Sequence, residues 1–423
     1  MVTRDAEEGA KKLGFSRAYS LALAPHLIYA RSNLLPAIVS SRTHNQLDFQ
    51  AVGSWFTVTA PSDGQARLTR VPSGREDVFR DDSLDLRAKR SLMKFLRFVS
   101  SYDEDSERQR MQDVKDLPFA AALRQHFGLN STTAVAPLLA LALPQGIAAE
   151  TTMASAVPRI ARHLRSIGMF GPGFSAVLPK WGGLAEIAQV ACRACAVGGG
   201  VYVLGKGVES STRAEDSRLL RLRLSGGEKG TTEWLVGCSG DLPVASRSPV
   251  ADEGPTVAKG IYIVSSPLTQ LFPPTSEGGV TPAGAVVWID LASSGTAPVR
   301  ILAHSSESGE CPPGQCVLYA SVTADHAGLD AAVNSLLESM GEQSRPEVLW
   351  RMHYTHRARQ PAIATPAPGE RVLLLPAVAN DVVLEDRVLE DVERAWRNIM
   401  GDEQSGGFLK FEAREGLGVE DVG

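Results

Sequence analysis

A long block of helical sequence interrupts a chain whose other segments resemble short strands. From Ser83 to about Phe127 apolar residues recur near a 3.6-residue period, and the helical pattern continues through "AVPRIARHLRSIGMF". Before this block "LDFQAVGSWFTV" predicts a strand, and beyond Gly198 the pieces "GVYVLG", "EWLVGC", "GIYIVSS", "GAVVWIDLA" and "CVLYASV" predict further strands. This order predicts an α/β fold with mixed sheets and an inserted all-helical domain.

These patterns also set the expected domain boundaries. Residues 1–87 and 176–423 should form a discontinuous α/β domain I, and residues 88–175 a helical domain II. A short helix is expected in "NLLPAIVSSRTH" and an amphipathic helix in "VLEDRVLEDVERAWRNIM", while residues 243–256 and 358–370 should be surface loops. In the helical block one apolar stripe should face the core, formed by Leu84, Leu92, Phe95, Leu96 and Val99.

Composition and charge narrow the class of protein. The chain has 423 residues, of which 43% are hydrophobic and 22% charged, and its formal net charge is −5. These values indicate a soluble globular protein without the basic footprint of a nucleic-acid binder, and the length favours two domains. The aliphatic run "AVAPLLALAL" is too short to span a bilayer, and five cysteines suit a reducing compartment, so we expect a cytoplasmic protein.

Two incomplete motifs overlap in residues 191–207, "ACRACAVGGGVYVLGKG". A phosphate-binding loop requires Ser or Thr after its lysine, but Gly207 follows Lys206, and "VYVL" favours a strand. A redox C-x-x-C motif opens a helix, whereas Cys192 and Cys195 lie late in one. We interpret both cysteines as structural thiols, with Cys195 on the buried stripe of this helix.

Other cofactor and metal signals are weak. No G-x-G-x-x-G fingerprint follows a predicted strand and opens a helix. Cys311 and Cys316, together with His353 and His356, are residue types that bind metals, but their spacing is too loose to predict a metal site. These motifs therefore predict no cofactor and no metal site.

The helix that contains the cysteines has a polar face as well. Glu186, Gln189 and Arg193 recur at i, i+3 and i+7, which aligns them along one exposed stripe. The glycines that follow allow the chain to turn into the predicted strand. Such a stripe is either a solvated face or a surface that recognises a partner.

The run "FSAVLPKWGGLAEIAQVACRACAVGGGVYVLGKGVES" resembles the signature of the Rab GDP-dissociation inhibitor and Rab escort protein superfamily. The segment "VPSGREDVFRDDSLDLRAKRSLMKFLRFV" is similar to the block of the escort branch, in which R-x-D-V-F precedes K-R-x-L-M-K-F-L. The resemblance covers residues 13–211 best, and "FQAVGSWF" is most similar to fungal escort proteins. The escort signature falls on Arg75, Asp77, Val78 and Phe79.

The resemblance implies a fold similar to flavin-dependent oxidoreductases, but without a bound flavin. It implies a non-catalytic protein that binds GDP-state Rab GTPases, presents them to the geranylgeranyltransferase α/β heterodimer, and shelters the attached geranylgeranyl lipid during transient membrane contact. Glu186, Gln189 and Arg193 then correspond to GTPase-contacting positions of the family. The Thr and Met of its GTPase-binding strand correspond to Val201 and Val203.

This chain differs from the family at its N-terminus. The family begins with a glycine-rich strand and helix and a "D-R-N-x-Y-Y-G-G" element, and this chain starts downstream of both. We therefore expect an N-terminally shortened member, whose α/β domain lacks the first Rossmann strand and its glycine motif. Three other functions stay open: a GDP-dissociation inhibitor that recycles prenylated Rab, a flavin-dependent oxidoreductase, and a truncation product that binds no partner.

Overall fold

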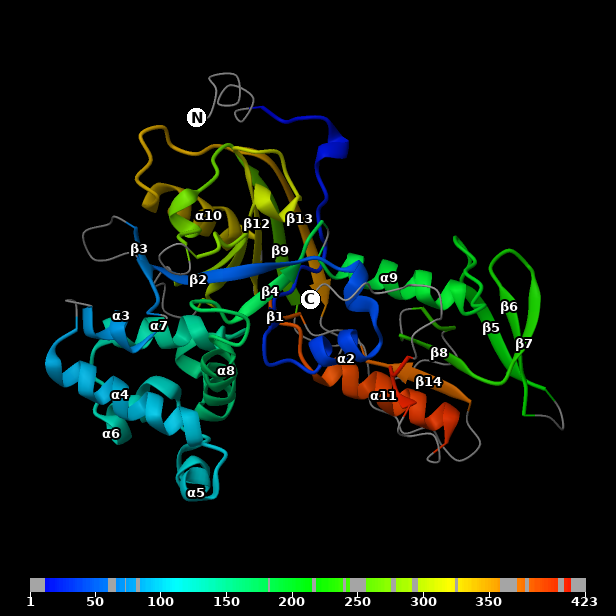
Figure 1. The fold of residues 1–423 in the computed structure, drawn as a ribbon, viewed down its shortest axis with the longest axis horizontal. Helices are drawn as coiled ribbons and strands as arrows, with labels where there is room; N and C mark the ends of the chain where they lie inside the picture. The colour runs from blue at the N-terminus through cyan, green and yellow to red at the C-terminus, as the bar shows by residue number, and fades with distance from the viewer. Residues whose placement is uncertain are drawn as a thin grey trace, which may run out of the picture.

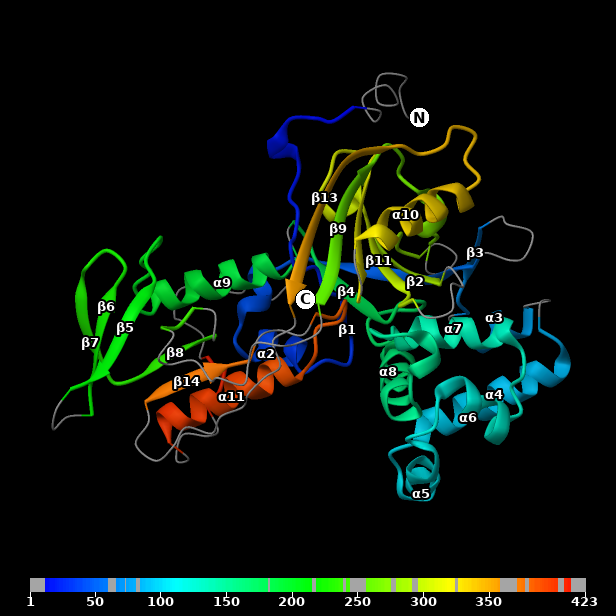
Figure 2. The ribbon, with the colours of Figure 1, turned by 180° about the vertical axis from the view of Figure 1, so that it is seen from behind.

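The computed structural model describes most of the chain, and Figures 1 and 2 show its three parts. These parts are a large sheet, a group of helices beside it, and a lobe of helices and small sheets on the other side. The described residues are 12–59, 66–72, 74–80, 84–181, 183–214, 218–238, 241–243, 256–274, 279–290, 296–323, 326–357, 371–376, 380–401 and 407–411.

Within these residues, nine strands form one mixed sheet. Their order is β1 (Ile28–Tyr29), β4 (Ala176–Pro179), β2 (Phe49–Thr59), β10 (Gly284–Asp290), β11 (Val299–Ser305), β12 (Cys316–Val322), β9 (Thr256–Val264) and β13 (Val348–Arg357), with β3 (Arg67–Arg70) paired to β2 beside this path. Strands β2 and β10 run parallel, and the other neighbours are antiparallel. The central strands β10, β11 and β12 are buried on both faces, which fits their nearly continuous aliphatic sequences.

Helix α10 (Ala327–Ser339) covers one face of this sheet (Figure 1). Its buried Leu329, Val333 and Leu336 share a core with Val287 of β10 and Leu318 of β12. The opposite face of the sheet belongs to a second core, which it shares with the group of helices. The sheet therefore lies between two layers, as is usual in an α/β fold.

The group of helices, here called the helical unit, lies between β3 and β4 in the chain (Figure 1). Its described α-helices are α3 (Arg75–Arg80), α4 (Leu86–Ser101), α5 (Asp105–Val114), α6 (Phe119–Phe127), α7 (Thr132–Ala142) and α8 (Met153–Ser166). The predicted apolar stripe of α4 is confirmed, because Leu92, Phe95 and Val99 are buried. Leu84 is buried just before the helix, and Leu96 packs against the same core. The boundaries of the two domains stay a prediction.

Aromatic rings tie the helical unit together and join it to the sheet. Phe95 of α4 packs edge-on against Phe127 of α6, with ring centroids 5.1 Å apart. His163 of α8 packs against Trp55 of β2, with centroids 4.5 Å apart. The position of the helical unit is therefore fixed by side chains from both sides of the junction.

The lobe on the other side contains three helices and two small sheets (Figure 1), counted over the described residues. They are α2 (Leu34–Ser40), α9 (Leu184–Val197), α11 (Arg387–Met400), a ribbon of β5 (Val208–Arg213), β6 (Leu220–Leu224) and β7 (Lys229–Thr232), and the parallel pair β8 (Leu235–Cys238) and β14 (Val372–Leu375). Helix α11 begins later than its amphipathic pattern predicts, because Val383 forms a β-bridge with Leu27.

The short 3-10 helices are η1 (Ser16–Ala18), η2 (Thr43–Gln46), η3 (Ala148–Glu150), η5 (Thr269–Leu271) and η6 (Ser306–Ser308). Over the described part of the chain, no helix is both long enough and apolar enough to cross a membrane. The mixed sheet with helices between its strands is the α/β fold that the sequence predicts.

Most predicted strands are confirmed, but one is wrong. The pieces "LDFQAVGSWFTV", "EWLVGC", "GIYIVSS", "GAVVWIDLA" and "CVLYASV" become β2, β8, β9, β10 and β12. Residues 201–207 form irregular chain instead, so Val201 and Val203 do not lie on a strand. A β-favouring sequence forms a strand only where a neighbour can pair with it, and no described strand pairs with this segment. Nearly all of the two predicted surface loops, residues 244–255 and 358–370, lies outside the described residues.

Candidate functional site

Helix α9 carries the predicted polar stripe and extends from the sheet towards the β5–β7 ribbon (Figure 1). It begins after Gly183, whose φ of +61° suits glycine, and it ends at Gly198. Near its start it packs against β4 and η2. Val190 is its one buried residue, so most of the helix is open to solvent.

The polar stripe is accessible, as predicted. Gln189 and Arg193 are exposed and Glu186 is half-buried. Gln189 Nε2 donates a weak hydrogen bond to Glu186 Oε1 at 3.5 Å, which brings these two side chains together. Arg193 has no hydrogen-bond or ion-pair partner among the residues that the structure describes. Its guanidinium group is therefore available to a partner molecule.

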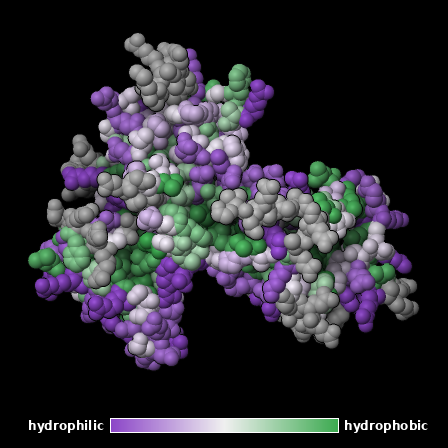
Figure 3. All heavy atoms as spheres, viewed as in Figure 1, coloured by the Kyte–Doolittle hydropathy of each residue, from purple (hydrophilic) through white to green (hydrophobic). Residues whose placement is uncertain are grey.

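The chain just beyond α9 exposes apolar side chains (Figure 3). Val201 is 85% exposed and Val203 is 57% exposed. The Gly200 N–H donates to Cys195 O at 2.9 Å, which turns the chain back at the end of the helix. A Cβ atom at Gly200 would lie 2.4 Å from Cys195 Sγ, so this turn requires glycine. We call the stripe and this segment together the α9 surface, which consists of Glu186, Gln189, Arg193, Val197, Val201, Tyr202, Val203 and Leu204.

The prediction that Cys195 belongs to a buried stripe is wrong. Cys195 is exposed and Cys192 is half-buried, and both are free thiols. The helical period groups residues on one face, but no described element covers that face along the second half of α9. Hydrogen bonds with the thiols of Cys195 and Cys192 raise the pKa of Tyr202. The sequence did not indicate this contact, because it placed Tyr202 in a strand.

The incomplete phosphate loop has another role in the structure. Lys206 Nζ lies 2.6 Å from Glu228 Oε1, and the Gly207 N–H donates to Ser225 Oγ at 3.2 Å. The segment leads into strand β5 and not into a helix whose N-terminus could hold a phosphate. These contacts attach the end of the segment to the β6–β7 hairpin.

The residues of the escort signature lie on α3, in the helical unit. Val78 is buried, Asp77 is half-buried and Phe79 is 59% exposed. Lys89 Nζ donates to Phe79 O at 2.7 Å, which ties α3 to α4. Arg75 begins the helix, but its side chain lies outside the described part of the structure. Helices α3 and α9 lie on opposite sides of the molecule in both views, so the structure does not bring the signature and the α9 surface together (Figures 1 and 2).

The loosely spaced cysteines and histidines have other partners. Burial raises the pKa of Cys311 to about 12, with a smaller effect of Glu310. Cys316 Sγ donates to His304 O at 3.1 Å, and His353 Nε2 lies 3.2 Å from Asp330 Oδ1. In the described residues, no three His, Cys, Asp or Glu side chains are grouped so as to hold a metal ion.

Comparisons with known sequences find one family and several relatives. The family model described as GDP dissociation inhibitor matches residues 2–275. The Rab proteins geranylgeranyltransferase component A of Saccharomyces cerevisiae is 27% identical over 327 residues, covering 77% of this chain and 51% of that protein. The protein of the same name from Drosophila melanogaster is 26% identical over 350 residues, covering 82% and 64%.

A plant protein and a solved structure extend the comparison. Rab escort protein 1 of Arabidopsis thaliana is 22% identical over 448 residues, covering 92% of this chain and 75% of that protein. The crystal structure of Rab GDI from Plasmodium falciparum has a TM-score of 0.68 at 18% identity, covering 92% of this chain and 84% of that chain. At that identity the likeness shows a shared fold. The chain spans between half and two thirds of the length of the yeast and fly relatives.

Proposed function

This chain belongs to the GDP dissociation inhibitor family, and we propose that it acts as a Rab escort protein. It binds Rab GTPases in the GDP state through the α9 surface and presents them to the α/β heterodimer of Rab geranylgeranyltransferase. It then shields the geranylgeranyl group until the Rab reaches a membrane, so we place it in the cytoplasm with transient membrane contact. It has no catalytic site of its own. The names of its relatives and the R-x-D-V-F block support an escort over a GDP-dissociation inhibitor.

The composition of the α9 surface carries this proposal. Glu186 and Arg193 lie two helical turns apart, about 10 Å along the axis, so one partner surface can contact both. Val201 and Val203 add exposed apolar side chains beyond them. An apolar patch beside charged hydrogen-bonding groups is the usual anatomy of a protein interface. On an ordinary solvated surface, exposed apolar residues occur singly. Here five lie in one segment, Val197 and Val201 to Leu204, which supports a role of this segment in binding a partner.

The position of the escort signature would allow a second protein to bind while the GTPase is bound. Phe79 is exposed on α3, and α3 lies across the molecule from α9 (Figure 1). Two proteins can therefore bind without competing for one surface. We assign the α9 surface to the GTPase and the α3 region to the transferase.

The helical unit supplies the apolar environment that a lipid requires. A twenty-carbon isoprenoid prefers an apolar phase by about 0.8 kcal/mol for each buried methylene, so a carrier must offer a comparable apolar groove. Helix α7 has the uncharged sequence "TTAVAPLLALA" and contains Pro137. Proline removes a backbone hydrogen bond inside a helix, which makes α7 a suitable place for the unit to open.

A prenylation assay tests the proposal. The purified chain is mixed with the transferase heterodimer, unprenylated GDP-bound Rab and labelled geranylgeranyl diphosphate. We expect lipid transfer only when both the chain and the transferase are present, and none to a Rab without its C-terminal cysteines. Equal transfer without the chain would contradict the escort function. Extraction of prenylated Rab from membranes without any stimulation of transfer would instead support a GDP-dissociation inhibitor, and flavin absorbance of the purified chain would support an oxidoreductase.

A further inference from the structure

Basic side chains are buried in the large sheet, on the face opposite α10. Arg300 of β11 pairs with Ser321 of β12, and Ser321 pairs with Lys259 of β9. The three side chains therefore lie in one row across neighbouring strands. Arg300 is 0% exposed, Ser321 6% and Lys259 7%. The sequence gives no sign of this row, because each residue lies alone in an aliphatic strand.

These donors lack hydrogen-bond partners. None of the guanidinium nitrogens of Arg300 forms a hydrogen bond, and neither does Ser321 Oγ, among the residues that the structure describes. The nearest carboxylate oxygen, Asp381 Oδ1, lies 3.7 Å from Arg300 Nη1. No described residue forms an ion pair or hydrogen bond with the ammonium group of Lys259. Arg300 therefore has one loose ion pair and Lys259 has none. A buried cation that is incompletely paired costs several kcal/mol, which favours the binding of a compensating group.

The carboxylates near the row do not balance its charge. Asp381 also accepts a hydrogen bond from Arg159 of α8, and Glu385 acts electrostatically on Arg159. Arg159 and Arg300 thus share Asp381, while Lys259 has no carboxylate partner among the described residues. Burial lowers the pKa of Lys259, and the charge of Arg300 lowers it further. The surplus positive charge therefore lies where Lys259 and Arg300 meet.

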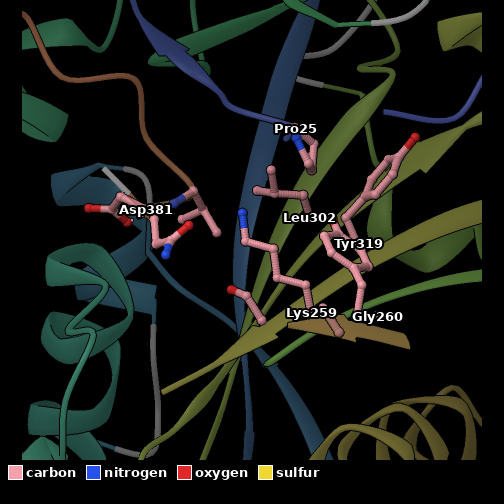
Figure 4. A pocket seen from close by; sticks show the side chains of 11 residues that line it. Pro25, Lys259, Gly260, Leu302, Tyr319 and Asp381 are labelled. Carbon is pink, nitrogen blue, oxygen red and sulfur yellow. Dashed lines mark hydrogen bonds between the residues drawn. The ribbon is translucent and has the colours of Figure 1, made fainter. Parts of the chain in front are cut away.

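A pocket opens beside this surplus charge (Figure 4). Its enclosed part has a volume of about 10 Å³, which is room for about one water molecule, so a larger ligand must bind at its open mouth. Lys259 reaches from the sheet into the space between Asp381 and Pro25 (Figure 4). Ser321 also lines the pocket, and Leu302 contributes an apolar part of the wall. The pocket therefore connects Lys259 and Ser321 to solvent, whereas Arg300 is fully buried and does not line it.

We propose that this pocket, here called the basic pocket, binds the phosphate group of a small soluble molecule. Lys259 offers up to about three N–H donors and Ser321 one, and the charge of the neighbouring, fully buried Arg300 adds to the positive potential there. A phosphate has more acceptor oxygens than a carboxylate and carries up to two negative charges, so it satisfies more of these donors. Asp381 stays paired with Arg159. This site is independent of the α9 surface and of the escort function.

Thermal unfolding of the full chain with inorganic phosphate tests the proposal. At equal ionic strength, phosphate should raise the melting temperature of the wild-type chain in a saturable way, and chloride should not. Lys259→Met should abolish the saturable shift and raise the melting temperature without phosphate, because it removes an unpaired buried charge. Phosphate also stabilises proteins through exclusion from their surface, and that non-saturable part should remain in the variant.

Two further variants make the test specific. Arg124→Met removes an exposed cation on α6 and should keep the full phosphate response. Ser321→Ala keeps both charges and should weaken phosphate binding, measured by calorimetry, while the chain stays folded. Equal phosphate responses of wild type and Lys259→Met would overturn the proposal, as would unchanged affinity in Ser321→Ala. Saturable stabilisation by acetate at the same concentrations would overturn the assignment to phosphate.

Discussion

Arg159 of α8 donates a hydrogen bond to the buried carboxylate of Asp381, a residue 222 positions further along the chain. Asp381 is 2% exposed and lies in the segment before α11, so this contact joins the helical unit to the C-terminal part of the chain. The same carboxylate lies 3.7 Å from the buried Arg300. One carboxylate thus connects a helix of the helical unit, the large sheet and the segment before α11.

Removal of this carboxylate should destabilise the chain strongly. Asp381→Ala leaves Arg159 and Arg300 without their shared acidic partner, so we expect the free energy of unfolding in urea to fall by about 3–5 kcal/mol. The control is Asp105→Ala, which breaks an ion pair with Arg108 whose side chains are 93% and 63% exposed. An exposed pair contributes about 0–1 kcal/mol. Similar losses of unfolding free energy in both variants would show that the buried ion pair stabilises the fold no more than an exposed one.

Gly309→Ala should disturb the connection that leads into α9. Gly309 has φ of +80°, and a Cβ atom there would lie 2.5 Å from the ring of Trp181. Trp181 lies just before α9, and its N–H donates to Ser308 O at 2.9 Å. We expect a loss of about 1–3 kcal/mol in urea unfolding. The matched control, Gly328→Ala in α10, meets open space and should gain up to about 1 kcal/mol. A Gly309→Ala variant that is as stable as Gly328→Ala would contradict the predicted geometry.

Stability should fall in mild acid because of His163. Burial lowers the pKa of His163 to about 3. In the unfolded chain its pKa is about 6.5, so between these values the unfolded state binds a proton that the folded state does not. The contribution of neutral His163 to the free energy of unfolding is fully present above about pH 6.5 and is lost as the pH falls through that value. The loss amounts to about 1.4 kcal/mol between pH 7.5 and 5.5.

The His163 prediction is tested by urea unfolding at both pH values. His163→Gln removes the titrating ring. The free energy of unfolding of this variant should therefore fall less between pH 7.5 and 5.5 than that of the wild type, by about 1.4 kcal/mol. Comparison with the variant subtracts the effect of His356, whose pKa is also lowered, chiefly by burial. Parallel losses in the two proteins would mean that His163 is protonated in the folded chain.

The cysteines of α9 should tolerate substitution. Cys192→Ser and Cys195→Ser should leave Rab affinity within about twofold and the melting temperature near that of the wild type, because neither thiol is buried. Both variants are compared with the wild type by Rab titration and thermal unfolding. A thiol-disulfide exchange activity that disappears in either variant would contradict the assignment of these thiols as non-catalytic.

Local patterns predicted much of the fold. The 3.6-residue period of α4 identified Leu92, Phe95 and Val99 as buried, because a long helix against a core keeps one face covered. The same period also placed Cys195 on a covered face, where the structure has none. Periodicity indicates which residues share a face, and only tertiary structure decides whether another element covers it.

Long-range relationships could not be predicted. The row of Arg300, Ser321 and Lys259 depends on the register of three strands, and Asp381 approaches it from the far end of the chain. The α9 stripe was predictable, because its three residues lie on one helix. The exposed loop at Val201 was not, since its sequence favours a strand for which the described chain provides no partner.

The central claim is that the α9 surface binds the GTPase, and titration of GDP-bound Rab with the Arg193→Ala variant tests it most directly. A charge-assisted hydrogen bond is worth about 1.5–3 kcal/mol, and 1.4 kcal/mol is about tenfold in affinity. We therefore predict affinity at least about tenfold weaker than wild type, a difference that shrinks at higher salt, and an unchanged melting temperature, because Arg193 is exposed. Arg97→Ala, an exposed arginine on α4, should bind Rab like the wild type. Equal affinities for wild type and Arg193→Ala would contradict the account and leave the stripe as a solvated face.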